Sequence, residues 1–407
     1  METNNLEDAF QPILVKMYLF VYFWLLLIFG LTSESMISPV DQPSAFPNLV
    51  SSGNKTAYVL ASILLFLGLF HKRSLLNWII TGPLFLIVIY GYFFVNQQIP
   101  VIGFVFLVWS SQVVPFRDLV RADFFSRIVV TVLLFVGNNL QLLPTSPEIQ
   151  LDDSTRLSFG FHHPNALGMY LMMIMIEAFY LYAKGKKWPV LGLVFGGILI
   201  YLLTRSRGSF LAVISFAALV GMHDIFKSKS LKRLLIYFCI AAPFICFFGS
   251  FVISVILPSN SRAFQTLNGL LSGRPELLKL IYEYYAQKSF FGASIAELAN
   301  SYYAWSINVK YLFVDNQYMY TVMIFGWFGA ALEIVYAVYC ALRAKIYENW
   351  FLLFWLTAMA FFGLVETKLV TLDMALPFMC LGSLAVHYKS EKVFSETDGG
   401  NLKLARN

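Results

Sequence analysis

The chain has 407 residues, of which 58% are hydrophobic and 13% are charged. A soluble domain of ordinary composition carries about 25% charged residues, so this composition excludes a soluble globular protein and indicates a polytopic membrane protein. The net charge of +6 does not indicate nucleic-acid binding, because most of the basic residues fall in short loops between apolar segments. The four cysteines (Cys239, Cys246, Cys340, Cys380) lie inside apolar segments, which argues against a disulfide framework or a CxxC metal site.

Apolar segments of the length needed to cross a bilayer, about 17–25 residues, recur along the chain. They predict an all-α transmembrane helical bundle of about 12 spans. The first is interpreted as a retained span, because no basic n-region or small-residue cleavage site accompanies it. The predicted spans are 13–33, 56–71, 78–95, 99–115, 127–143, 164–183, 189–204, 208–223, 233–257, 316–342, 350–365 and 373–388.

Basic residues gather in alternate connections between these spans, which sets the predicted orientation. Lys and Arg favour the cytoplasmic side, so both termini are predicted to be cytoplasmic. The basic inner segments are 71–73, 117–127, 184–187, 227–233, 343–345 and the tail from 389. The predicted organisation therefore has four parts. Residues 1–257 contain transmembrane helices 1–9, with outer motifs at 156–168 and 204–209, and residues 258–315 form a large extracytoplasmic loop. Residues 316–388 contain transmembrane helices 10–12, and residues 389–407 form a cytoplasmic tail.

Two arginines stand together on the predicted outer side, at Arg205-Ser206-Arg207-Gly208, where a span begins. The first amide N–H groups of a helix have no internal partner and carry partial positive charge, so they bind anions. Guanidinium groups bind phosphate in a bidentate way. The anion expected at an outer bilayer surface is a lipid-linked phosphate or pyrophosphate. The alternative is that both arginines extend to lipid headgroups.

Two further outer span starts carry polar groups, His-His-Pro-Asn at 162–165 and Asp-Asn at 315–316. Arg156 and Arg274 lie in the adjoining outer loops and could join one anion site. The alternatives are hydrated interfacial histidines, an ordinary helix N-cap at 315–316, and ion pairs of the two arginines with nearby loop acids.

The outer loop 258–315 contains a helix-start pattern, Ser-Gly-Arg-Pro-Glu at 272–276, with Pro and Glu in the first turn. An apolar stripe follows, so a helix on the outer interface or over a cavity is expected. Glu177 and Glu333 lie inside predicted spans, near inner ends that water reaches, and are interpreted as structural. No motif for ATP use or zinc hydrolysis is present.

These motifs together resemble the bacterial O-antigen polymerase (Wzy) and O-antigen ligase superfamily. The residues that carry the resemblance are Arg156, Gly160-Phe161-His162-His163-Pro164-Asn165, Gly168, Thr204-Arg205-Ser206-Arg207-Gly208-Ser209, Ser272-Gly273-Arg274, Val314-Asp315-Asn316-Gln317-Tyr318, Gly326 and Gly329. The resemblance implies an integral-membrane glycosyltransferase with a GT-C-like helical fold. It implies undecaprenyl-pyrophosphate-linked glycans as donors, with Arg205 and Arg207 holding the pyrophosphate.

The resemblance also implies that Arg156, Arg274, His163 and Asn165 shape the pyrophosphate pocket. The chemistry of the transfer indicates what else the site needs. Negative charge develops on the leaving pyrophosphate, and a base takes the proton of an acceptor sugar hydroxyl; His163, Asp315 and Glu276 remain open as that base. The predicted catalytic residues are Arg205, Arg207, His163 and Asp315, and the predicted substrate-binding residues are Arg156, Asn165, Arg274, Asn316 and Glu276. The basic cluster is expected to replace a divalent metal, so no metal or cofactor is predicted.

The predicted function is polymerisation of lipid-linked repeat units at the outer face of the bacterial cytoplasmic membrane. The expected partners are an undecaprenyl-pyrophosphate-linked oligosaccharide and membrane lipid, with a chain-length regulator left open and no nucleic acid. The superfamily's ligases typically carry a functional histidine in the large outer loop, and residues 258–315 contain no histidine, which favours a polymerase. The alternatives are a ligase-like glycan transferase and a flippase or transporter of lipid-linked oligosaccharide.

Overall fold

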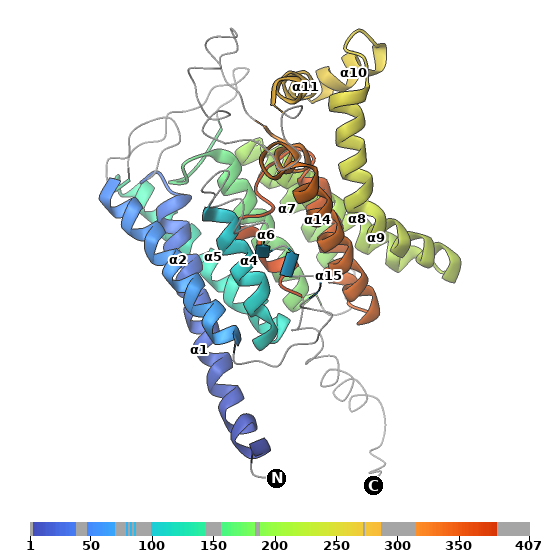
Figure 1. The fold of residues 1–407 in the computed structure, drawn as a ribbon. Coiled ribbons are helices and arrows are strands. Elements are labelled where there is room, and N and C mark those ends of the chain that lie inside the picture. Colours follow the sequence, from blue (N-terminus) through green and yellow to red (C-terminus); the bar gives the residue numbers. More distant parts are fainter. Residues whose placement is uncertain are drawn as a thin grey trace.

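The computed structural model describes residues 3–37, 47–69, 79, 82–83, 85–86, 99–143, 156–183, 188–271, 273–285 and 314–380. Within these residues the regular structure is helical, with no β-strand beyond one isolated bridge between Ser35 and Phe161. Figure 1 shows the helices packed side by side as a bundle. The protein is therefore an all-α polytopic membrane protein, as the composition predicts.

The main helices follow the chain in this order: α1 (Thr3–Ser33), α2 (Pro47–Leu69), α4 (Ile99–Ser110), α5 (Phe116–Asn139), α6 (Pro164–Tyr182), α7 (Trp188–Thr204), α8 (Arg207–Ile225), α9 (Lys229–Phe251), α10 (Arg262–Leu270), α11 (Arg274–Tyr285), α14 (Gln317–Ile346) and α15 (Trp350–Phe362). Short 3-10 turns occur at η2 (Ser111–Val113), η4 (Leu372–Met374) and η5 (Leu376–Phe378), and a π-helical turn, η3 (Val252–Ile256), extends α9.

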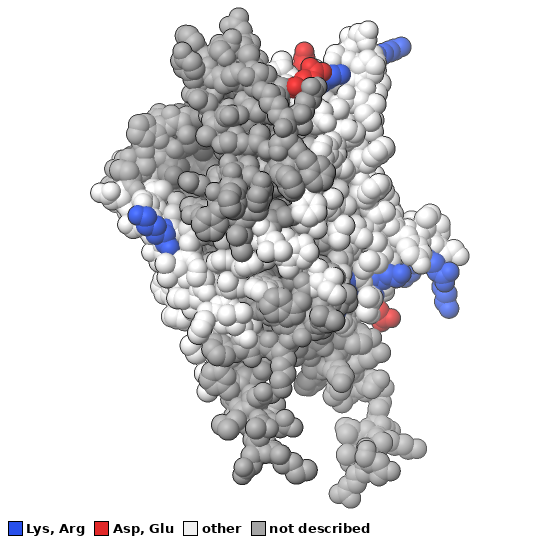
Figure 2. All heavy atoms as spheres, viewed as in Figure 1, with Lys and Arg blue, Asp and Glu red and all other residues white. Residues whose placement is uncertain are grey.

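Six helices of the described part are long and apolar enough to cross a membrane. They lie at Pro12–Ser33, Asn48–Leu69, Pro164–Tyr182, Arg207–Ile225, Lys229–Ile256 and Gln317–Ile346. Shorter apolar helices lie at Val101–Val113, Pro189–Thr204 and Trp350–Phe362. In Figure 2, charged side chains gather over α10–α11 and near the start of α9, and the surface between them carries few charges. Such a surface suits contact with lipid, where charge is costly.

Several helix ends meet at one end of the bundle. The His162 N–H donates to the Glu34 carbonyl at 3.0 Å, joining α6 to α1, and the Gln317 N–H donates to the Gly363 carbonyl at 2.8 Å, joining α14 to α15. Figure 1 shows α10 and α11 at this same end, opposite the first turn of α1. We call the region formed by residues 34–36, 156–165, 204–208, 273–276, 314–317 and 363–373 the polar end.

Two predicted helix starts are wrong. α2 begins at Pro47, and α5 begins at Phe116, ahead of the expected starts at 56 and 127. Arg127, predicted at the end of an inner loop, lies inside α5 with 2% of its side chain exposed. Hydropathy places the start of α5 too late because its first turns carry charged residues. Arg121 pairs with Asp118 on the exposed helix surface, whereas Asp123 and Arg127, further along, are paired inside the bundle.

Arg127 lies in a buried ionic cluster of the bundle core. Its Nε contacts Asp123 one turn earlier and lies 3.2 Å from Glu177 Oε1 on α6, and Tyr22 donates to the other oxygen of Asp123 at 2.6 Å. Glu177 is 0% exposed. The expectation that water reaches Glu177 is therefore wrong, although its structural role fits the ion pair.

The predicted last span, 373–388, does not begin as an α-helix. Residues 372–378 form two 3-10 turns, with Asp373 buried, and residues 381–388 lie outside the described part. The predicted span 78–95 also lies almost wholly outside it. α14 is interrupted at Gly326, whose φ of 68° and ψ of −174° are not helical. Beside this break an apolar cavity is lined partly by Glu333, which accepts a hydrogen bond from Thr321.

Candidate functional site

The start of α6 is held by a tight loop that ties it to the end of α1. Gly160 has φ +88°, and a Cβ there would lie 2.5 Å from the Leu134 carbonyl oxygen, so the position requires glycine. The Gly160 carbonyl accepts the Met36 N–H at 2.9 Å. His163 is the N-cap of α6: its Nδ1 accepts the Asn165 N–H at 3.0 Å. This contact shows how His163 starts the helix and leaves its predicted catalytic role untested.

Asn165 links an arginine to a carboxyl group. Arg156 Nη2 donates to Asn165 Oδ1 at 2.6 Å, and Asn165 Nδ2 donates to Glu366 Oε1 at 3.0 Å. Arg156 Nε also donates to the Thr204 carbonyl at 3.0 Å, next to the start of α8. The chain of contacts from Arg156 through Asn165 to Glu366 thus joins the starts of α6 and α8 to the loop after α15.

The turn between α7 and α8 places Arg205 and Arg207 on either side of one capping residue. Arg205 has φ +52°, the left-handed region, and its N–H donates to the Tyr201 carbonyl at 2.8 Å, ending α7. Ser206 is the N-cap of α8 and accepts the Ser209 N–H. Both arginine side chains are exposed. The Arg205 guanidinium lies over the Tyr201 ring, 5.5 Å from its centroid.

The loop after α15, residues 363–371, is held by bonds to its backbone carbonyls. Arg274 Nη1 donates to the Val365 carbonyl at 2.8 Å, and Asn316 Nδ2 donates to the Leu364 carbonyl at 3.0 Å. Arg274 also pairs with Asp315 at 3.2 Å between Nη2 and Oδ2. These bonds fix the loop between α11 and α14, so Glu366 projects from a held backbone.

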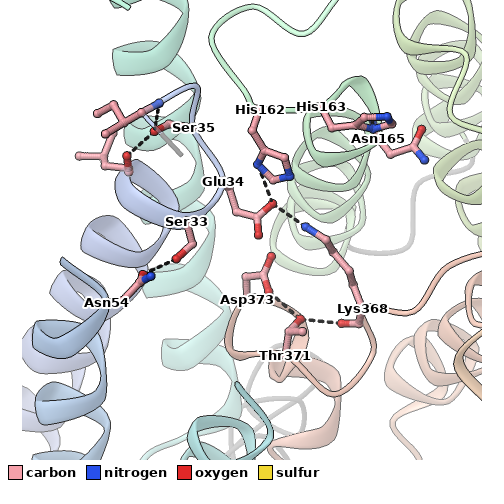
Figure 3. Close-up of polar contacts among 12 residues, drawn as sticks. Ser33, Glu34, Ser35, Asn54, His162, His163, Asn165, Lys368, Thr371 and Asp373 are labelled. Atoms are coloured by element: carbon pink, nitrogen blue, oxygen red, sulfur yellow. Dashed lines mark hydrogen bonds and ion pairs between the residues drawn. The ribbon is translucent and has the colours of Figure 1, made fainter. Parts of the chain in front are cut away.

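Figure 3 shows a second group of contacts on the other side of the α6 start. His162 turns toward Glu34, whereas His163 and Asn165 point away from it (Figure 3). Lys368 Nζ lies 2.7 Å from Glu34 Oε2, and His162 Nδ1 lies 3.8 Å from the same oxygen. Burial, more than the nearby Lys368, lowers the pKa of His162 to about 3. The neutral imidazole leaves Lys368 as the partner that balances the Glu34 charge.

Burial and charge perturb the groups around Asn165. Burial lowers the pKa of His163 to about 4, with the Arg156 charge adding to the effect. Burial also lowers the pKa of Arg156, and the positive charges of Arg274 and Arg207 act in the same direction. These effects place Arg274 and Arg207 within electrostatic range of Arg156.

Burial raises the pKa of Glu366 to about 7, and the negative charge of Asp315 adds to it, against the positive charges of Arg274, Lys368 and Arg156. The pKa of Asp315 is raised by burial, against the opposing effect of Arg274. The polar end therefore combines several fixed cations with one carboxyl group that changes its charge near neutral pH.

The predicted site residues do not all lie around one site. Arg156, Asn165, Arg274 and Asp315 surround Glu366, whereas Glu276 is exposed and its Oε2 accepts from Asn268 Nδ2 at 2.9 Å. Asn316 is 5% exposed, and its side chain caps α14 and holds Leu364. These contacts favour the structural alternative for Asn316, and its predicted substrate role stays a prediction.

Sequence reasoning did not single out Glu366, Lys368 or Glu34. The available signal was the pair of charges in Glu366-Thr367-Lys368, in a connection between apolar segments on the same predicted side as the other motifs. Within the described residues, no group of three or more His, Cys, Asp or Glu has the arrangement of a metal site.

Comparison with known families gives a match over the part of the chain that forms much of this site. Residues 168–334 match the family model described as O-antigen ligase. The match over this region supports the O-antigen polymerase and ligase superfamily. The match covers the start of α8, the loop with α10 and α11, and the first half of α14. No curated protein matches the chain. The superfamily assignment supports a glycan-transferring enzyme of the membrane.

Proposed function

We propose that the protein polymerises lipid-linked repeat units of a bacterial cell-surface polysaccharide. The enzyme transfers an undecaprenyl-pyrophosphate-linked chain onto the next lipid-linked repeat unit, at the outer face of the cytoplasmic membrane. The observation that carries the proposal is the start of α8, where two exposed arginines flank a helix N-terminus. Fixed guanidinium groups and helix N–H groups stabilise the charge that develops on a leaving pyrophosphate.

The roles within this proposal follow from position. Arg205 and Arg207 hold the pyrophosphate, while Arg156 and Arg274 lie deeper and add positive potential. The cations do the work that a divalent metal performs in other pyrophosphate sites, so the reaction proceeds without metal. The membrane orientation, with both termini cytoplasmic, rests on the charge of the inner loops.

The test uses purified protein in lipid vesicles with a lipid-linked repeat unit as the only substrate. We expect a ladder of lengthened products from the wild type and from Arg233→Ala, a matched variant at the exposed start of α9. Arg207→Ala is expected to reduce the rate about 100-fold to 1,000-fold, as loss of one transition-state donor does elsewhere. A normal ladder from a folded Arg207→Ala protein overturns the assigned role.

A ligase-type transfer is the second candidate, because the matching family model is described as O-antigen ligase. A ligase moves a finished glycan to a different acceptor and gives no ladder from the repeat unit alone. Product that forms only after a second acceptor is added selects the ligase. Repeat units that cross the bilayer chemically unchanged select the flippase alternative.

A further inference from the structure

Glu366 lies where the starts of α6 and α8 meet. Its Oε1 accepts the Asn165 amide at 3.0 Å. A Cβ on Gly208 would lie 2.7 Å from Glu366 Cγ, so the missing side chain at Gly208 makes room for this glutamate. Within the described residues, Oε2 accepts no hydrogen bond. The carboxyl group is therefore held through one oxygen and keeps the other for a ligand.

The charged groups facing Glu366 come from every side of the polar end. Arg156 precedes α6, Arg274 begins α11, and Asp315 precedes α14, while Lys368 lies on the same loop as Glu366. Burial and Asp315 together outweigh the three cations and raise the pKa of Glu366 to about 7. A base with a pKa near the working pH combines a useful ionised fraction with proton affinity.

The other carboxyl and imidazole groups considered as bases are engaged elsewhere. His163 Nδ1 accepts the Asn165 N–H that starts α6, and burial lowers the pKa of its ring to about 4. Asp315 is ion-paired with Arg274 at 3.2 Å. Glu276 is exposed and bonded within the α10–α11 hairpin. Glu366 differs from the other two carboxyl groups because it is oriented by the neutral Asn165 amide, is not paired with a cation among the described residues, and lies between the starts of α6 and α8.

We propose that Glu366 is the base that takes the proton from the attacking hydroxyl of the acceptor sugar; this inference rests on the proposed glycan transfer. The acceptor oxygen forms a bond to the anomeric carbon of the donor. The bond between that carbon and the phosphate oxygen breaks, and its electron pair stays on the pyrophosphate beside the arginines. The hydroxyl proton moves to Glu366 Oε2, so no oxidant or further reactant is needed. Asn165 positions the carboxyl group by holding Oε1.

The test compares Glu366→Gln with Glu283→Gln, the same substitution at an exposed residue of α11. The rate of polymer formation is measured between about pH 5 and pH 9 at saturating repeat unit. The wild type and Glu283→Gln are expected to gain rate as pH rises, about tenfold per unit below pH 7, and to level off above it. The rate rises with pH because Glu366 is protonated at pH values below its pKa, and a protonated carboxyl group cannot accept the hydroxyl proton.

Glu366→Gln is expected to lower the plateau rate by about 100-fold to 10,000-fold and to abolish this pH dependence. Glu366→Asp is expected to restore part of the rate together with the pH dependence. A Glu366→Gln rate close to that of Glu283→Gln, or an unchanged pH profile, overturns the proposal. Should Glu366→Gln fail to fold, a wild-type rate that does not change between about pH 5 and pH 7 overturns it as well.

Arg207→Ala separates the failure of this inference from the failure of the proposed function. A normal Glu366→Gln enzyme beside an inactive Arg207→Ala enzyme refutes the role of Glu366 and leaves glycan transfer in place. Normal ladders from both variants refute the assignment of the polar end as the site. No ladder from the wild type refutes the polymerase itself.

Discussion

The buried pairing of Arg127 with two carboxyl groups makes a quantitative prediction about stability. Arg127 is 2% exposed, Asp123 1% and Glu177 0%. The cation also donates through Nη2 to the carbonyl of Asp373 in η4, the 3-10 turn that follows the loop carrying Glu366. Arg127→Met removes the cation and leaves two buried carboxyl groups without their partner. Breaking a buried ion pair from one side costs about 3–5 kcal/mol.

The assay is unfolding of the purified protein in mixed micelles, with the free energy of unfolding compared between variants. Arg127→Met is expected to lose about 3–5 kcal/mol. Adding Asp123→Asn and Glu177→Gln to Arg127→Met replaces both orphaned carboxyl groups and is expected to recover most of the loss, because a buried ionic group and a neutral replacement often have similar stability. Asn at 123 keeps an oxygen for the Tyr22 hydroxyl, which now donates to Asp123 at 2.6 Å.

A loss below about 1 kcal/mol for Arg127→Met would refute the reasoning, since exposed pairs contribute that little. Equal losses for the single and triple variants would also refute it. In that case the packing of the arginine stem, and not its charge, would account for the effect.

Arg205→Gly separates the backbone strain of the α7–α8 turn from the role of the guanidinium. Because the φ of +52° at Arg205 suits glycine, the unfolding midpoint of the protein is expected to stay level or rise. Polymer formation is expected to be lost together with the guanidinium. A lower midpoint would contradict the backbone argument. Gly168→Ala is expected to lower stability by about 1–3 kcal/mol, because its Cβ would lie 2.7 Å from Ser206 Cβ and push α6 from the start of α8. Gly192→Ala on α7, where no atom of the described residues beyond its chain neighbours and its own helix backbone lies within 4 Å of the added Cβ, is the control and should be at least as stable as the wild type; equal losses in both would contradict the close approach.

The sequence by itself determined the class of the protein and the approximate place of most spans. Apolar length and composition are local properties, so α6, α7, α8 and α15 begin at or within one residue of their predicted starts. The pattern of apolar runs also reveals the polar motifs, because polar residues at helix starts interrupt these runs. The motifs lie at 156–165, 205–208 and 314–316. Their common location at one end of the bundle follows from the alternation of the spans.

Tertiary structure alone decided which polar groups work together. Nothing in the sequence around Arg127 shows that Glu177, on α6, lies beside it. Hydropathy therefore treats Arg127 as a loop residue and predicts the start of α5 too late. The same limit hid Glu366: its partner Asn165 is 201 positions away, and only folding brings Asn165 and Arg156 to it. Its pKa near 7 depends on burial and on charges from several helices, which no local pattern encodes because electrostatic interactions act through space.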